Sequence, residues 1–331
     1  MTQPLIDIRG LRKFYPIRGG LFRRPAQVRA VDDISFALES HEVLGLAGES
    51  GSGKSTIGRT ILRLTEPTSG EIIFKGENVA TFDRRRLHRF RRDAQIIFQD
   101  PFASLDPRMK IGQIVAEPLA VQNVACGKKR RDKVAEMLDL VSLSADYMDR
   151  MPHELSGGQR QRVVIARALV VSPQFVVADE PVSALDVSIQ AQIIALLKSL
   201  KQRLGLSILF ISHDLAVMEY LSDRIAVLYL GRLMEIGPTR AICGAPHHPY
   251  TRALLSAVPQ LDPRKRKARM ILKGDIPTAI DPPSGCVFRT RCPFAIAACA
   301  DPVPMRELSP GHWSGCIRDD IPASAAPAEG P

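Results

Sequence analysis

Short apolar runs and longer amphipathic stretches alternate along the chain. The apolar runs have the length of buried strands and lie at residues 43–47, 175–178, 206–212 and 224–229. Between about 102 and 170, including 111–121 and 133–141, apolar residues recur with a helical period, which predicts a helical subdomain. Strands that alternate with helices favour a mainly parallel sheet.

A second set of short runs, at residues 6–15, 30–38 and 71–74, is bounded by Gly, Pro or Asp. This pattern predicts an antiparallel sheet beside the main core. Residues 16–27 contain Gly19, Gly20 and Pro25 and are expected to form a surface loop or a hairpin excursion.

A glycine-rich segment follows the apolar run at 43–47 and precedes a helical pattern. It has the spacing Gly-x4-Gly-Lys-Ser. Its glycines let backbone N–H groups converge on an anion, the next helix presents its positive end, Lys54 adds a charge and the Ser55 hydroxyl is placed to ligate Mg²⁺. The alternative is a glycine-rich turn without function. A chance match of this kind is rarer when a strand precedes the segment and a helix follows it. The expected ligand is a nucleoside triphosphate, and the residues expected to hold it are Gly48, Glu49, Ser50, Gly51, Ser52, Gly53, Lys54, Ser55 and Thr56.

Two carboxylates end the apolar run at 175–178. Asp179 is suited to the Mg²⁺ shell and Glu180 to orienting an attacking water. Alone, such a pair is more often a solvated strand end. Three further segments make the pattern specific: Leu155-Ser156-Gly157-Gly158-Gln159, Ser183-Ala184-Leu185-Asp186 and Ile211-Ser212-His213-Asp214.

In order and spacing these segments resemble the nucleotide-binding subunit of ABC transporters, over residues 1 to about 262. The resemblance implies an α/β fold of the P-loop NTPase, ABC-cassette type, with a mainly parallel sheet core, an antiparallel β subdomain and a helical subdomain that carries the signature. It implies ATP hydrolysis with Glu180, His213 and Gln99 as catalytic residues. It also implies Mg²⁺ ligation by Ser55, Gln99 and Asp179, adenine stacking on Tyr15 and a D-loop at Asp186.

The residues of the signature segment are suited to forming a second phosphate site. Ser156 can cap a helix that begins near Gly157 and runs through Leu169, so that its N–H groups and dipole form a second phosphate site. In the family this surface, Leu155 to Gln159, closes on ATP held by the opposite subunit. The resemblance therefore implies a dimer that sandwiches two ATP molecules, and slow turnover by the isolated chain.

Composition agrees with a large α/β core plus an appendage. The chain has 331 residues, no apolar stretch of membrane-spanning length and no leader pattern at its start. Its net charge of +10 suits nucleotide binding and a position near an anionic membrane surface. Basic runs at 84–92, 128–131 and 264–269 contain a single aromatic residue, Phe90, and no series of aromatics for stacking bases. We therefore interpret them as solvated faces and expect no nucleic-acid partner.

The segment His248-Pro249-Tyr250-Thr251, followed by a basic linker and Pro282-Pro283-Ser284-Gly285-Cys286, resembles the C-terminal extension of oligopeptide and dipeptide importer ATPases, in their second-ATPase branch. The resemblance implies a peripheral subunit on the cytoplasmic face of the cell membrane, with a second ATPase, two permease subunits and an extracytoplasmic binding protein as partners. Importers of nickel, glutathione and murein peptides share the extension, so these cargoes remain alternatives to peptides. We expect an ATP-binding domain at 1–262, the extension at 263–320 and a disordered tail at 321–331.

Four of the six cysteines are clustered in the extension, at Cys286, Cys292, Cys299 and Cys316. In a reducing compartment, clustering favours a metal site over disulfides. The spacing lacks the Cys-x2-Cys pairs of a zinc ribbon, and four thiolates suit an iron–sulfur cluster. By resemblance to the peptide-importer branch we expect a [4Fe–4S] cluster, with zinc and unliganded thiols as alternatives. A proline-rich segment of this length has little core of its own, so a metal would serve as its staple.

Other ABC proteins fit less well. A ribosome-associated ABC protein would carry two cassettes in one chain, and a DNA-repair ATPase would carry a long insertion between Lys54 and Asp179. An export ATPase would not be expected to carry the peptide-importer extension.

Overall fold

The computed structural model describes residues 3–17, 26–258 and 270–321. The chain divides into two compact units. The first comprises Met1–Leu5, Leu38–Val43 and Thr81–Ile211, and the second comprises Ile6–Ala37, Leu44–Ala80 and Ser212–Pro331. Each unit therefore draws on distant parts of the sequence.

The first unit is built on three parallel strands in the order β8-β7-β6. They are β6 (Ala94–Ile97), β7 (Phe175–Asp179) and β8 (Ser207–Ile211). Every residue of β7 and β8 is buried, as expected for strands covered on both faces. The helix α7 (Val187–Leu204) leads from β7 towards β8 along the chain, and α2 (Arg84–Asp93) precedes β6.

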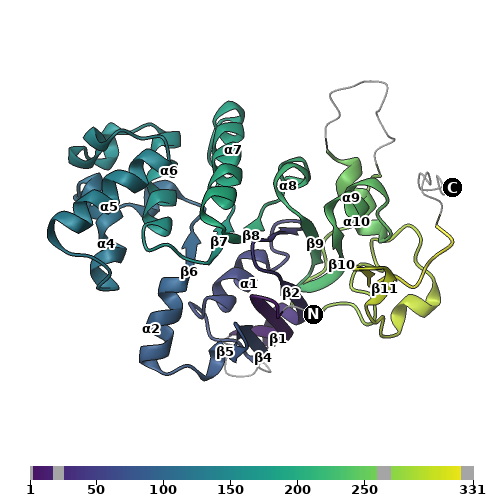
Figure 1. Cartoon of the computed structure of the whole chain (residues 1–331). Coiled ribbons are helices and arrows are strands. Elements are labelled where there is room, and N and C mark those ends of the chain that lie inside the picture. The colour runs from purple at the N-terminus through teal and green to yellow at the C-terminus, as the bar shows by residue number, and fades with distance from the viewer. Residues whose placement is uncertain (1–2, 18–25, 259–269, 322–331) are drawn as a thin grey trace. The chain divides into compact units, whose positions relative to one another are not determined.

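The rest of the first unit is helical and lies in the section where the sequence predicts it (Figure 1). Its helices are α3 (Pro101–Ser104), α4 (Ile111–Val121), α5 (Gly127–Leu140) and α6 (Gly157–Leu169), with 3-10 turns at Ala145–Asp149 and Pro152–Glu154. On α4 the buried residues are Ile111, Ile114, Val115 and Leu119, one helical face that packs on α5 and α6.

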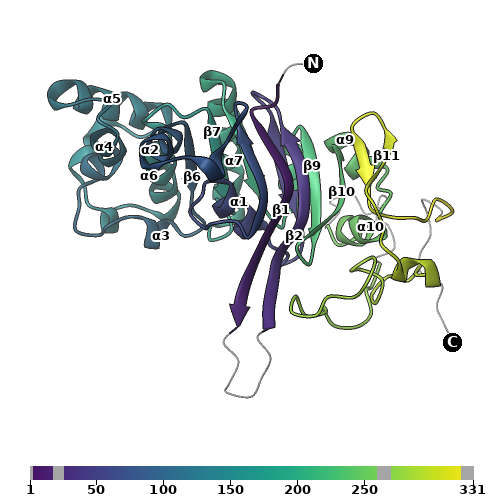
Figure 2. The ribbon, with the colours of Figure 1, turned by 90° about the horizontal axis from the view of Figure 1, so that it is seen from below.

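The second unit contains an antiparallel sheet of four strands in the order β2-β1-β4-β5. They are β1 (Ile6–Ile17), β2 (Ala26–Leu38), β4 (Ser69–Phe74) and β5 (Glu77–Asn78), followed by the 3-10 turn Val79–Thr81. β1 pairs with β4 from Ile6 opposite Phe74 to Arg12 opposite Ser69. β1 and β2 run side by side as one long ribbon (Figure 2). At the ends of the expected loop at 16–27, residues 16–17 belong to β1 and residues 26–27 belong to β2. Residues 18–25 lie outside the described part.

The same unit holds a second group of strands in the order β11-β12-β10-β9-β3. They are β3 (Val43–Ala47), β9 (Arg224–Tyr229), β10 (Arg232–Pro238), β11 (Arg306–Ser309) and β12 (His312–Ser314). β3 and β9 are parallel, and β10 to β12 add antiparallel neighbours. The helices here are α1 (Lys54–Ile61), α8 (Leu215–Leu221), α9 (Thr239–Gly244) and α10 (Pro249–Ser256), with a 3-10 turn at Ala297–Ala300.

The described part of the C-terminal extension is not built on a core of its own. Its strands β11 and β12 join β10, with Ile236 opposite Trp313, and its Val287 and Phe288 have no exposed surface. The expectation that the segment has little core of its own agrees with this, and strand pairing and burial in a shared core hold the segment without a metal. The expected tail beyond Ile321 lies outside the described residues.

No helix among the described residues is both long enough and apolar enough to cross a membrane.

Candidate nucleotide-binding site

The glycine-rich segment forms the turn between the fully buried strand β3 and the helix α1. Two of its glycines are required by close backbone approach. A Cβ on Gly48 would lie 2.3 Å from the Leu228 carbonyl oxygen, and one on Gly53 would lie 2.1 Å from the Ala30 carbonyl oxygen. Gly53 also has φ of 99°, a region that disfavours side chains. The turn is thus fixed tightly against its neighbours.

The polar groups of this turn suit an anion. In the described chain no side chain caps the start of α1, which leaves the first N–H groups of the helix directed out of its end. Lys54 is buried, and its ammonium donates to the carbonyl oxygens of Gly48 at 2.7 Å and Glu49 at 2.9 Å. The buried Ser52 hydroxyl finds no hydrogen-bond partner among the described residues. A phosphate is the kind of ligand that such a donor set would satisfy.

Two further expected residues lie in the same unit as this turn. Tyr15 is on β1 with its ring partly exposed, and the Lys13 ammonium lies 4.9 Å from the ring centroid. His213 is exposed and precedes Asp214, whose side chain caps α8 by accepting from the N–H groups of Ala216 and Val217. The cap fixes the chain on the carboxyl side of His213.

In the other unit, the parallel pairing of β6 and β7 brings two expected catalytic residues together. Ile97 lies opposite Ala178, so Gln99 and Glu180 both follow neighbouring strand ends. The Gln99 amide donates to the Glu180 carboxylate at 3.1 Å. Glu180 has φ of 46°, which is a strained conformation for a residue with a side chain, and its N–H donates to the Ile211 carbonyl at 3.0 Å. Asp179, at the end of β7, is almost fully buried.

The signature segment begins α6 as the sequence predicts. Ser156 is its N-cap and forms a capping box with Gln159: the Gln159 N–H donates to the serine hydroxyl, and the Ser156 N–H donates to the glutamine side chain at 2.9 Å. The Gln159 amide also donates to the Tyr147 hydroxyl at 2.9 Å. Asp186 is the N-cap residue of α7.

The glycines of the signature face α7 and the loop before it. A Cβ on Gly158 would lie 2.7 Å from Ile189 Cγ2, so even an alanine there would force a shift. Gly157 is 3.4 Å from Leu185 by the same measure. The expected site residues therefore divide between the units: the glycine-rich turn, Tyr15 and His213 in one, and Gln99, Asp179, Glu180, the signature and Asp186 in the other.

The four clustered cysteines are free thiols around one small cavity of about 20 Å³. Burial raises the pKa of Cys286 to about 11 and that of Cys292 to about 12, and it also raises the pKa of Cys316. Neutral thiols are therefore the stable form at neutral pH in this arrangement. Within the described residues, no group of three or more His, Cys, Asp or Glu side chains is arranged to hold a metal ion. The expected iron–sulfur cluster is thus unsupported, although the cysteines do converge.

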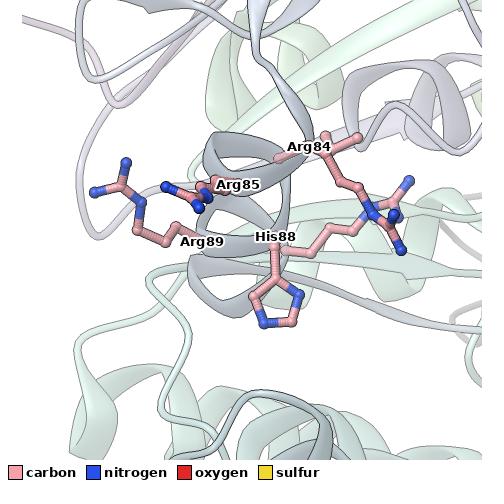
Figure 3. A pocket seen from close by; sticks show the side chains of 6 residues that line it. Arg84, Arg85, His88 and Arg89 are labelled. Atoms are coloured by element: carbon pink, nitrogen blue, oxygen red, sulfur yellow. The ribbon is translucent and has the colours of Figure 1, made fainter.

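A larger hollow, of about 650 Å³, lies along α2 and contains no expected site residue. It is lined by Leu87, His88 and the arginines 84, 85, 89 and 91. The labelled side chains leave the helix in different directions (Figure 3), and those of Arg84, Arg85, His88 and Arg89 are exposed. This agrees with the interpretation of the first basic run as a solvated face. The run at 264–269 lies outside the described residues.

Two family models match parts of the chain. A family model described as ABC transporter matches residues 31–183, and one described as oligopeptide/dipeptide transporter, C-terminal region, matches residues 234–299.

Similar proteins match almost the whole chain. A putative peptide import ATP-binding protein of Brucella ovis is 57% identical over 97% of this chain and 100% of its own length. The dipeptide transport ATP-binding protein DppF of Haemophilus influenzae is 48% identical, over 96% and 97%. The oligopeptide transport ATP-binding protein AppF of Bacillus subtilis is 47% identical, over 95% and 97%.

Solved structures of single cassettes share the fold. A dimeric, post-hydrolysis structure of the ATP-binding cassette MJ0796 bound to ADP and Pi has a TM-score of 0.63 and 30% identity, and it covers 71% of this chain and 99% of its own. The cbiO1 protein of Clostridium perfringens, part of the transporter complex cbiONQ, also has a TM-score of 0.63, with 25% identity.

Proposed function

The chain belongs to the ABC transporter family of ATP-binding proteins, and on that premise we propose that it hydrolyses ATP to power the import of di- or oligopeptides through a membrane permease. The observation that carries the substrate class is the match of residues 234–299 to the oligopeptide/dipeptide transporter C-terminal region, together with the full-length similarity to peptide import proteins. Nickel, glutathione or murein peptides are the alternative cargo, because importers of these compounds share the extension.

The residues of the glycine-rich turn, here called the P-loop (residues 48–55), would hold the phosphates of ATP. Lys54 would leave the carbonyl oxygens that it now contacts and neutralise charge on the phosphates, as the N–H groups at the start of α1 do. Ser55, Gln99 and Asp179 would ligate Mg²⁺, which neutralises charge that develops during phosphoryl transfer. Tyr15 would stack on the adenine.

Hydrolysis requires a correctly held water. We assign this role to Glu180, whose carboxylate is oriented by the Gln99 amide at 3.1 Å. His213 would contact the γ-phosphate. The capped start of α6, Leu155 to Gln159, would complete the ATP site of a second subunit together with Asp186, whose neighbour Leu185 lies beside Gly157. One chain cannot use both phosphate sites on one nucleotide.

The partners that follow are a second ATPase subunit, two permease subunits and an extracytoplasmic binding protein, with this chain on the cytoplasmic face of the membrane. The described surface around α3 supports a docking role, because Phe102 is 59% exposed and Arg160 lies over its ring at 4.2 Å. The permease contact would involve residues 99–106 together with the helical subdomain, which would bind a short cytoplasmic helix of the permease.

Two variants test the chemistry in the full chain. Glu180→Gln keeps the hydrogen bond to Gln99 but removes the carboxylate, so we expect turnover to fall by about 10²- to 10⁴-fold with ATP affinity retained. Lys54→Ala should weaken ATP binding itself. Steady-state ATPase assays and calorimetric titration separate the two effects. Wild-type turnover of Glu180→Gln would reject that assignment, and unchanged ATP affinity of Lys54→Ala would reject the P-loop assignment.

A second proposal concerns the cysteines 286, 292, 299 and 316. They would hold a [4Fe–4S] cluster with a structural or regulatory role, because nothing in ATP hydrolysis requires electrons. The proposal starts from their convergence on one cavity, where the cationic core of a cluster would stabilise thiolates that burial otherwise disfavours. The arrangement described here would have to open to admit a cluster, since it offers no metal-holding group among the described residues.

A further inference from the structure

The second residue of the P-loop, Glu49, is held by side chains that lie far away in the sequence. The Arg291 guanidinium lies 3.0 Å from the Glu49 carboxylate. Both side chains are largely shielded, with 10% of the arginine and 26% of the glutamate exposed. The pair is therefore screened less than an ordinary surface ion pair.

The backbone of Glu49 is held as well. Its N–H donates to the Tyr250 hydroxyl at 3.0 Å, and its carbonyl accepts from Lys54. Tyr250 is fully buried, with its ring at 4.8 Å from that of Tyr229 and at 5.2 Å from that of Phe288, in edge and tilted contacts. Burial raises the pKa of Tyr250, so the hydroxyl stays protonated over the physiological range.

The Arg291 contact to Glu49 comes from the cysteine-bearing turn of the extension, whereas Tyr250 lies on α10. In this turn the Arg289 N–H donates to the Cys286 carbonyl and the Arg291 N–H donates to the Phe288 carbonyl, each at 3.0 Å. Phe288 and Arg291 thus point into the unit that contains the P-loop, where Phe288 has no exposed surface and Arg291 also contacts the Tyr229 ring.

We propose that Arg291 and Tyr250 are positioning residues for nucleotide binding: together they fix Glu49, and Arg291 masks its negative charge so that a polyphosphate can approach the P-loop. The proposal rests on the proposed binding of ATP at this loop. The physical reason is Coulombic, because an unmasked carboxylate in the phosphate cradle would repel the same anion that Lys54 attracts.

The test is a double-mutant cycle in the full-length protein, read out as the affinity for Mg-AMP-PNP and Mg-ADP by titration calorimetry. Arg291→Met removes the guanidinium while keeping an unbranched side chain, and should weaken AMP-PNP binding about tenfold. ADP, which carries less charge, should lose less. Adding Glu49→Gln should restore most of the lost affinity, because no charge then needs masking. In steady-state assays Arg291→Met should raise the KM for ATP and leave kcat nearly unchanged.

Arg289→Met is the matched control. Arg289 lies in the same turn, but its guanidinium bonds to Ser284, so its loss should leave affinity unchanged. Tyr250→Phe, which deletes only the hydroxyl, gives a second measure and should weaken binding about threefold.

Two results would overturn the proposal: wild-type affinity in both Arg291→Met and Tyr250→Phe, or losses in Arg291→Met that Glu49→Gln does not relieve. Lys54→Ala separates a failure of the proposed ATP site from a failure of the masking role of Arg291. If it also leaves affinity unchanged, nucleotide binds elsewhere and the proposed function fails, whereas a loss there with no effect at Arg291 rejects only the masking role.

Discussion

The carboxylate of Glu235 joins the C-terminal extension to the rest of its unit and gives a sharp test of how the extension is held. Glu235 lies on β10 with no exposed surface. It accepts the N–H of His247 at 2.8 Å and that of His248 at 3.0 Å, and His312 Nε2 of β12 lies 2.8 Å from it. Burial alone would raise the pKa of Glu235, but these hydrogen bonds outweigh burial and hold its pKa below the ordinary value.

The variant Glu235→Gln keeps the size of the side chain and removes the charge. An amide nitrogen would face donors where a carboxylate oxygen now accepts, so one or two of the three hydrogen bonds must be lost. Removing one partner from a buried charged network costs about 3–5 kcal/mol, and we expect a loss of unfolding free energy in that range.

The pH dependence follows from the lowered pKa. A carboxyl with a depressed pKa stabilises the fold above its unfolded value, about 4.3, and this stabilisation is lost as pH falls through the lower folded value. Wild-type protein should therefore lose stability in this range through Glu235, and Glu235→Gln should lack that part of the acid sensitivity.

The chain supplies its own probe, because its single tryptophan, Trp313, lies on β12 next to His312. Guanidinium unfolding followed by Trp313 fluorescence at pH 7 and at a series of pH values below about 4.3 measures both effects. Glu307→Gln is the control, since this exposed carboxylate on β11 accepts only from the Gly311 N–H and should cost under about 1 kcal/mol. A Glu235→Gln midpoint equal to that of wild type at pH 7, or the same fall in stability as wild type below about pH 4.3, would refute the reasoning.

Two other predictions concern the partners and the cysteines. A photocrosslinker placed at Ser104 on α3 should capture a permease subunit in membranes, and capture of ribosomal or DNA-bound proteins alone would reject the docking site. Protein purified without oxygen should contain iron and acid-labile sulfide if a cluster is present, and Cys292→Ser should lower the iron content. Colourless, iron-free protein, or full iron content in Cys292→Ser, would overturn the assignment of a cluster to these four cysteines.

Elements with strong local signals were predicted with correct bounds. β3 covers the predicted residues 43–47, and α4 covers 111–121, because burial on all sides and the helical period are both visible in a short window. The cap of α6 by Ser156 is also predicted from a local signal, since a serine stands directly before the helical pattern.

Long-range pairing left no such signal. β11 and β12 have four and three residues, too few for a period, and the contact that holds them joins His312 to Glu235. Arg291 and Glu49 are likewise 242 positions apart. In both pairs neither residue belongs to a sequence motif that names its partner. Only the folded chain shows that Arg291 contacts Glu49 and that His312 contacts Glu235.

These contacts form a continuous series from the extension to the P-loop. His312 and Glu235 fix the N–H groups of His247 and His248, and His248 caps α10 by accepting the Tyr250 N–H at 3.1 Å. Tyr250 in turn takes the N–H of Glu49. Since each member restricts the next, loosening the extension at Glu235 also loosens one of the groups that hold Glu49. At the proposed nucleotide site, the docking of the extension and the position of Glu49 would therefore be coupled, because both depend on the segment from His247 to Tyr250.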